Sequence, residues 1–364
     1  MENFFELLRY SLGITDTFNT KLSPEEWKTV FESAHHQSLV GIMFCGVSKL
    51  SSELAPPLNI VMQWTAEAEK IRGMNKAFNI RAKELTDFFA QHNHKSVILK
   101  GQANARLYPD TLSRQPGDID IYVDGGKKSV MQMLNELNLL KKGGYVAYHH
   151  VELNDENSDI TVEVHFRPSS GIHNAFGNKQ IQNFLNNDIK NVTLSEEGFN
   201  IPSLKFALTM QMAHIHKHFF GTGIGLRQIT DYYFLLKTST QDDRQCVASH
   251  LKQFKLKKFA AALMWTLQHI FLLEEEYMLC PPNPKSGQQL FETVSQGGNF
   301  GWHSNYFKES FIKRQFKHRK RMFKMFTLFP QDVFWERFKN YTFILKTIPL
   351  RIRHRSLSLK DVDL

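Results

Sequence analysis

The sequence predicts an α/β plus α fold, in which a small mixed β-sheet lies between N-terminal helices and a C-terminal helical bundle. Three observations indicate this fold. The first region has helical periodicity, the middle alternates short β-branched runs with short helical patterns, and the chain after Pro202 is again helical in pattern. We therefore expect an N-terminal helical region over residues 1–95, an α/β core over 96–200 and a C-terminal helical domain over 201–364.

The bulk composition is typical of a folded protein with anionic partners. The 364 residues are 42% hydrophobic and carry a formal net charge of +9, which favours nucleotides, nucleic acid, acidic polymers or a membrane surface as partners. The three cysteines are far apart and have no CxxC spacing, so we expect neither a disulfide framework nor a cysteine zinc site. The sequence has no secretory signal pattern and no window of about 20 residues free of polar groups, so we predict a cytoplasmic protein without a transmembrane segment.

In the N-terminal region, local signals define two helical segments. Ser23 is followed directly by Pro24 and, three positions on, by Glu26, which is the pattern of a capped helix start. Residues 58–89 contain few helix breakers and predict one long helix, or two helices separated at Gly73.

The middle of the chain predicts a mixed sheet. The run SVILKG predicts a strand that ends at Gly101, and the segment QANARLY after it predicts a helix that stops near Pro109. The strand DIDIYV over residues 118–123 comes next, followed by a helix over about 127–140. The stretches YVAYHHVEL and DITVEVHFR, separated by the polar NDENSD, predict a β-hairpin.

After Pro202 the helical patterns include three histidines close together. A helix over PSLKFALTMQMAHIHKHFF ends at the glycine-rich GTGIG, and a second helix, LRQITDYYFLLK, follows. His214 and His218 share one face of the first helix, and His216 does not. Since a zinc pair has no third ligand in view, we expect polar histidines on a helix face, with Lys217 and His218 as alternative contacts to a phosphate.

Two aspartates occupy one face of the predicted strand DIDIYV. Asp118 and Asp120 lie on the same side because side chains alternate with period two, and Ile119 and Ile121 point to the other side. Carboxylates this close repel each other and are costly to bury unless a cation or a basic group compensates them. The structural alternative is simple alternation on a half-exposed strand.

A third carboxylate completes a candidate metal site. Nucleotidyl transfer needs two divalent ions about 4 Å apart, which hold the triphosphate and lower the charge on the attacking and leaving oxygens. Mg²⁺ takes oxygen ligands, mostly carboxylates and water. Glu163 shares a strand face with Thr161 and His165, and it would also accept the proton of the attacking hydroxyl. We therefore expect two Mg²⁺ or Mn²⁺ ions at Asp118, Asp120 and Glu163.

The stretch LKGQANARLYPDTLSRQPGDIDIYVD, followed by VEVHFRP, resembles the nucleotidyltransferase superfamily of the DNA polymerase beta type, and most of all its poorly characterised bacterial branch. The superfamily pattern is an apolar residue, Gly, Gly or Ser, a spacer, Asp-apolar-Asp, and a third acidic residue on a later strand. Asp118, Asp120 and Glu163 match these acidic positions. HKHFFGTGIGLRQITDYYFLL and GNFG at residues 298–301 also resemble that branch, so the resemblance covers roughly residues 96–301.

The phosphate contacts are expected upstream of the aspartates. Gly101 stands where the predicted strand meets a helix, so the backbone amides of Gly101 and Gln102 would approach a phosphate, with Lys100 and Arg114 adding positive charge. Gln102 departs from the superfamily pattern, which has glycine or serine there. A backbone cradle survives that change, but a hydroxyl contact to the triphosphate is lost.

Two further basic features have both a structural and a functional interpretation. Arg227 and Asp231 are four residues apart and would form an ion pair on one helix, or Arg227 would support the site. The segment over residues 311–326 would either pack on the bundle or contact RNA or an anionic surface. Its apolar stripe at helical spacing comprises Ile312, Phe316, Arg319, Phe323 and Phe326.

The resemblance implies a metal-dependent nucleotidyltransferase. Such an enzyme moves a nucleoside monophosphate from a triphosphate such as ATP to the hydroxyl of an acceptor (a small molecule, a protein or RNA) and releases pyrophosphate. The alternative is a catalytically weak or inactive regulatory protein of the same fold that binds nucleotides or polyanions, which Gln102 and the basic C-terminal segment favour.

Overall fold

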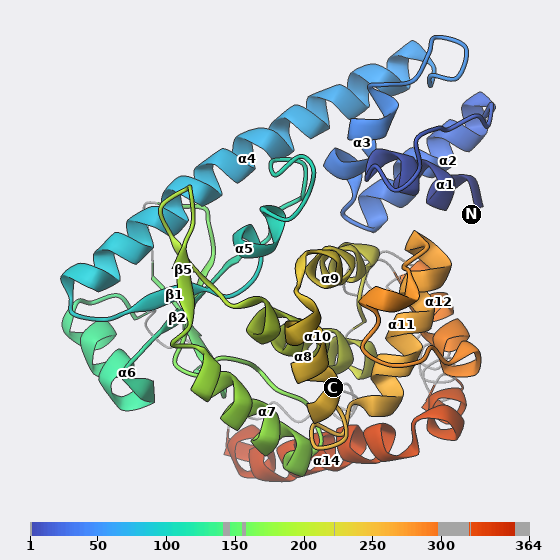
Figure 1. Ribbon diagram of the computed structural model, residues 1–364. Helices are drawn as coiled ribbons and strands as arrows, with labels where there is room; N and C mark the ends of the chain where they lie inside the picture. The colour runs from blue at the N-terminus through green and yellow to red at the C-terminus, as the bar shows by residue number, and fades with distance from the viewer. Residues whose placement is uncertain are drawn as a thin grey trace.

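The computed structural model describes residues 2–140, 146–154, 158–221, 223–297, 320 and 322–353. Helices at the N-terminus lead into a small mixed sheet, and a helical bundle follows (Figure 1). The predicted α/β plus α fold is therefore confirmed. Within the described part of the chain, no helix is both long and apolar enough to cross a membrane.

The N-terminal helices pack on one another and on the long helix α4. Ser23 begins the second of them as predicted, because its hydroxyl accepts a hydrogen bond from the Glu26 amide while the Glu26 carboxylate accepts one from the Ser23 amide. The bounds are α1 (Glu2–Ser11), α2 (Pro24–His36), α3 (Val40–Val47) and α4 (Leu58–Gln91).

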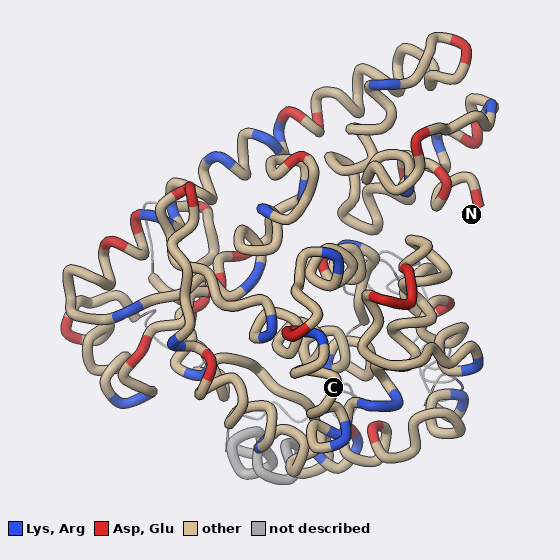
Figure 2. Tube along the Cα trace, viewed as in Figure 1, with Lys and Arg blue, Asp and Glu red and all other residues tan. Residues whose placement is uncertain are grey.

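Helix α4 is a single helix that crosses Gly73 without a break. It runs from the N-terminal helices to the sheet, so it connects two parts of the molecule (Figure 1). Acidic and basic residues are mixed along it (Figure 2), and exposed ion pairs such as Lys83–Asp87 lie on its surface. Of the two predicted alternatives, one long helix is correct.

The central sheet has the strand order β1-β2-β4-β3. β2 and β4 are parallel, while β1–β2 and β3–β4 are antiparallel, so the sheet is mixed and the predicted hairpin is confirmed. The bounds are β1 (Ser96–Ile98), β2 (Ile119–Val123), β3 (His150–Glu152) and β4 (Val162–His165). A separate antiparallel ribbon pairs β5 (Val192–Leu194) with β6 (Asn200–Pro202).

The two faces of the sheet differ in polarity, as the alternation of side chains predicts. On one face, Ile119, Ile121 and Val164 are buried in a cluster with residues of α4 and of α6 (Gly126–Glu136). The other face carries Asp120 and Glu163, and the helical half of the molecule covers it. Asp120 is consequently only 1% exposed, so alternation on a half-exposed strand does not account for it, whereas the Asp118 side chain is 38% exposed.

The helical half contributes α8 and α9 next to the sheet, and its apolar core includes residues of the N-terminal helices. The division at residues 95 and 200 stays a prediction. The bounds are α7 (Ala175–Asp188), α8 (Leu204–Phe220), α9 (Leu226–Thr238), α10 (Gln241–His250), α11 (Lys257–Phe271), η1 (Glu275–Tyr277), α12 (Pro284–Gly297) and α14 (Pro330–Arg353).

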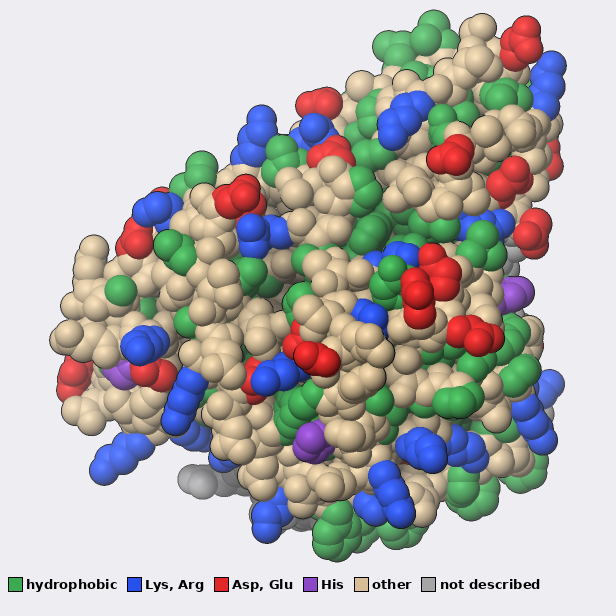
Figure 3. Space-filling view, viewed as in Figure 1, with side chains coloured by type: hydrophobic (Ala, Val, Ile, Leu, Met, Phe, Trp, Pro, Cys, Tyr) green, Lys and Arg blue, Asp and Glu red, His purple; other side chains and the backbone are tan. Residues whose placement is uncertain are grey.

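The C-terminal prediction needs a correction. Residues 298–301 and most of 311–321 lie outside the described residues, but residues 322–328 are helical. There Met322 and Met325 are buried, whereas Phe323 and Phe326 are exposed by 74% and 51%. The alternative in which the stripe packs on the bundle is therefore wrong at both phenylalanines, because the helix turns its methionines toward the bundle. Hydrophobic side chains also gather on the surface at α14 (Figure 3), where Phe334 is exposed.

Candidate active site

The three predicted carboxylates meet at the sheet. β2 and β4 are parallel neighbours, and their register places Asp120 beside Glu163 on one face. Asp118 lies just before β2, and one carboxylate oxygen from each of Asp118, Asp120 and Glu163 lies within 4.8 Å of the others. The structure therefore brings together residues that are 45 positions apart in sequence, and oxygen atoms so placed could hold a divalent cation.

These carboxylates line a cavity of about 320 Å³ between the sheet and the helical half. The sheet side contributes Gly101 and Gly117 besides the acidic residues, and α8 and α9 contribute Lys217 and Arg227. The cavity thus has an acidic floor and basic walls, which is the distribution of charge that a metal-bound polyphosphate requires.

Lys100 lies against the acidic pair. Its Nζ is 2.6 Å from Asp120 Oδ2 and 3.7 Å from Asp118 Oδ2. Burial alone would lower the pKa of Lys100, but Asp120 and Asp118 outweigh burial and raise it, so the ammonium stays charged. Asp120 in turn raises the pKa of Asp118 by repulsion, although Lys100 opposes this. Lys100, which the sequence predicts to contact a phosphate, therefore compensates the charge of Asp118 and Asp120 in this structure.

Histidines hold the other two carboxylates in their ionised form. His165 Nε2 is 3.0 Å from Asp120 Oδ1, and His150 Nδ1 is 3.0 Å from Glu163 Oε2. Burial would raise the pKa of Asp120 and Glu163, but the contacts with Lys100 and the two histidines lower both pKa values. An ionised carboxylate of this kind suits cation binding better than proton acceptance.

Arg114 has a carboxylate partner that the sequence did not predict. It lines the cavity, but its Nε and Nη2 donate to the two oxygens of Asp231 at 2.7 and 2.8 Å, and both side chains are buried. Tyr108 also donates to Asp231, at 2.7 Å. The bidentate pair joins the loop before β2 to α9, so Arg114 is a positioning group with its charge already compensated.

Arg227, by contrast, points at the acidic end of the cavity. Its Nη1 donates to the Gln115 carbonyl at 2.8 Å, and its guanidinium lies beside Gly117. Burial, reinforced by Arg114, lowers the pKa of Arg227 to about 10, which still leaves it charged at pH 7. Among the described residues, the ion-pair partner of Asp231 is Arg114 and not Arg227. A contact between distant segments therefore replaces the predicted pair of Arg227 and Asp231 within one helix.

Gln102 lies where the predicted phosphate cradle begins, but its side chain points away from the cavity. Its Nε2 donates to Asn79 Oδ1 at 2.6 Å and to Asn75 Oδ1 at 3.3 Å, both on α4. The helix after Gly101, α5 (Gln102–Ala105), is only four residues long and so much shorter than predicted. Gly101 itself lines the cavity with a φ of 64°, a conformation that favours glycine.

Helix α8 places basic side chains on the cavity wall. His214 and His218 have ring centroids 4.4 Å apart and line the cavity with Lys217, while His216 turns away and is 2.9 Å from Asp332 of α14. Burial lowers the pKa of His218 to about 4 and that of Lys217 to about 8. The predicted shared face of His214 and His218, without His216, is therefore confirmed, and this face lies against the cavity.

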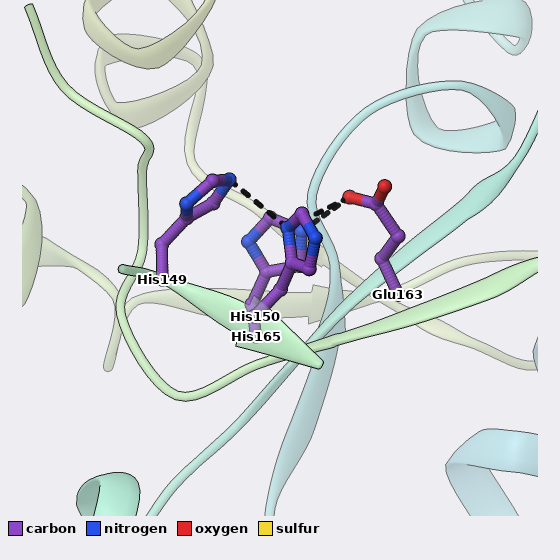
Figure 4. A group of neighbouring side chains, drawn as sticks. All are labelled: His149, His150, Glu163 and His165. Carbon is purple, nitrogen blue, oxygen red and sulfur yellow. Dashed lines mark hydrogen bonds and ion pairs between the residues drawn. The ribbon is translucent and has the colours of Figure 1, made fainter. Parts of the chain in front are cut away.

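Two cavity residues were not singled out from the sequence. His150 begins β3 and His149 comes directly before it, and both lie next to Glu163 and His165 (Figure 4). The predicted hairpin could have identified these two histidines. Antiparallel pairing of its two strands brings the HH pair opposite the strand that carries Glu163 and His165.

Comparison with known proteins places the chain in a family but gives no close characterised relative. No curated protein matches the sequence. A family model described as an uncharacterised nucleotidyltransferase matches residues 23–272, which include the sheet, all three carboxylates and α8–α11. Because the match covers well over half of the 364 residues and agrees with the Asp-apolar-Asp resemblance, the chain belongs to this uncharacterised nucleotidyltransferase family.

Proposed function

We propose that this protein is a metal-dependent nucleotidyltransferase that moves a nucleoside monophosphate from a triphosphate to an acceptor hydroxyl and releases pyrophosphate. The convergence of Asp118, Asp120 and Glu163 in one cavity is the observation that carries the proposal. The family membership supports the reaction class and implies a nucleotide substrate.

The residues present fit a divalent cation. Three carboxylates meet within 4.8 Å, and the ammonium of Lys100 already occupies a cation position against two of them. In our proposal Asp118, Asp120 and Glu163 hold two Mg²⁺ or Mn²⁺ ions. Bound there, the ions would hold the triphosphate and lower the charge on the attacking and leaving oxygens.

In our proposal the other cavity residues either bind the phosphates of the nucleotide or hold neighbouring elements in position. Lys217 and Arg227 line the cavity, and we assign them to the phosphates. Lys100 would exchange its carboxylate partners for phosphate oxygens when metal and nucleotide bind, because divalent ions then compensate the aspartates. Gly101 would present backbone amides, while Arg114 fixes α9 against the loop that leads into β2.

The test is pyrophosphate release from each nucleoside triphosphate in the presence of Mg²⁺ or Mn²⁺, with a cell extract as the source of acceptor. Asp118→Asn and Asp120→Asn should each abolish release. Asp124→Asn is the matched control, because Asp124 directly follows the same strand but accepts a hydrogen bond from the Lys95 amide outside the cavity. Full activity in either of the first two variants would refute the assignment.

A second candidate function is a nucleotide-binding regulatory protein without turnover. The ion pair of Lys100 with Asp120 favours it, because the acidic group is partly compensated without any metal. Calorimetric titration with ATP and Mg²⁺ separates the two, since a regulatory protein would bind nucleotide without releasing pyrophosphate. If the acceptor is RNA, activity should fall steeply between low and moderate salt.

A further inference from the structure

A second cluster of metal-binding side chains lies beside the acidic group. Three imidazoles and one carboxylate, from His149, His150, His165 and Glu163, each place one ligand atom within 4.8 Å of the others. Figure 4 shows the rings of His150 and His165 close together, with Glu163 on one side and His149 on the other. β3 and β4 create this arrangement, because His150 and His165 are direct partners in the antiparallel ladder.

Three of the separations between these atoms are close to those of a tetrahedral site. His149 Nε2 and His150 Nδ1 are 3.1 Å apart, and Glu163 Oε2 is 3.0 Å from His150 Nδ1 and 3.4 Å from His165 Nε2. Zinc bound by nitrogen or oxygen at about 2.0–2.1 Å has neighbouring ligands about 3.3 Å apart in a tetrahedron. Three of the six separations are therefore close to this value, and the other three are at most 4.8 Å.

Hydrogen bonding among the rings does not account for the cluster. His150 Nδ1 lies at hydrogen-bond distance from both His149 Nε2 and Glu163 Oε2, yet a ring nitrogen carries at most one hydrogen. One of these two contacts therefore lacks a proton, and a cation shared by the ring nitrogens and the carboxylate would take its place.

We propose that His149, His150, His165 and Glu163 form a second metal site, which takes Zn²⁺ or a similar borderline transition-metal ion. Imidazole nitrogen suits zinc and its neighbours, whereas Mg²⁺ takes oxygen ligands, so this site differs in kind from the group at Asp118 and Asp120. Glu163 belongs to both sets. The proposal does not depend on nucleotidyl transfer, because a regulatory protein with this cavity would hold the same ion.

The experiment measures zinc binding to the full-length chain without a histidine tag, after removal of metals with a chelator. Competition with a chromophoric zinc chelator gives the affinity, and elemental analysis after dialysis gives the stoichiometry. We expect one tightly held zinc per chain in the wild type. His149→Gln and His150→Gln should each weaken binding at least about tenfold, because each removes a direct ligand.

Two variants control for the position of the ion. Asp118→Asn should keep wild-type zinc affinity, since Asp118 is outside the histidine set. His35→Gln removes a histidine that is 42% exposed on α2 and pairs with Glu67, so it reports on loose surface binding. Equal affinity in all four variants, or a loss with Asp118→Asn as large as with His150→Gln, would overturn the histidine site.

Thermal unfolding provides a readout that does not require activity, and it also shows whether each variant is folded. The metal-free variants should melt close to the metal-free wild type, and zinc should then raise the melting temperature of the wild type and not that of His150→Gln. If His150→Gln does not fold, His149→Gln decides, since His149 precedes the strand. A wild type that shows neither bound zinc nor a shift at micromolar zinc would refute the proposal.

Discussion

Removal of the Lys100 ammonium should destabilise the metal-free protein. At 2.6 Å from Asp120 Oδ2, an effective dielectric constant of about 20 gives an attraction of about 6 kcal/mol, which desolvation of the ions largely offsets. Loss of one partner from a buried pair still costs about 3–5 kcal/mol, because the other charge stays buried. We therefore expect Lys100→Met to lower the free energy of unfolding by about 3 kcal/mol, measured by urea denaturation with EDTA.

The control is Lys83→Met on α4. Lys83 Nζ is also 2.6 Å from its partner, Asp87 Oδ2, but both side chains are about half exposed, so this variant should lose no more than about 0.5 kcal/mol. Millimolar Mn²⁺ should restore part of the loss in Lys100→Met, because a divalent ion would take over the compensation of the aspartates. If Lys100→Met cost no more than Lys83→Met, the electrostatic reasoning about this site would be wrong.

Three further predictions follow from the site. Asp231→Ala should lower the free energy of unfolding by about 3–5 kcal/mol in urea denaturation, because Arg114 is left buried without its partner. The double variant Arg114→Met/Asp231→Leu should lose less, and additive losses would contradict this reasoning. Since burial lowers the pKa of His218 to about 4, the unfolded chain takes up a proton below pH about 6.5 that the folded chain does not. Stability should therefore fall from pH 6.5 toward pH 4, and His218→Gln should remove up to about 3 kcal/mol of that fall in thermal scans with EDTA; an unchanged pH profile would count against it. Gln102→Ser should lower the free energy of unfolding by about 1–3 kcal/mol without raising pyrophosphate release, because the Gln102 side chain binds α4 outside the cavity. Higher turnover in this variant would show that a hydroxyl at this position does contact the triphosphate.

Local patterns in the sequence were sufficient for much of the fold. The cap at Ser23, the helical pattern over α4 and the alternation along β2 each depend on residues only a few positions apart, although only the structure decided that α4 crosses Gly73 unbroken. The same alternation assigned Asp120 and Glu163 to one side of their strands before any contact between the strands was known. These features are predictable because helix and strand periodicities are properties of the backbone itself.

Only the tertiary structure decided how charges and rings pair across the cavity. Lys100 against Asp120 and Arg114 against Asp231 join segments whose relative position no local pattern encodes. The methionine face at residues 322–328 is of the same kind, because a helix with several apolar faces is oriented by the neighbour that it packs against. The sequence by itself determined which side chains share a face of each element. Tertiary packing decided which faces meet, because burial and charge compensation between distant segments arise only when the elements pack together.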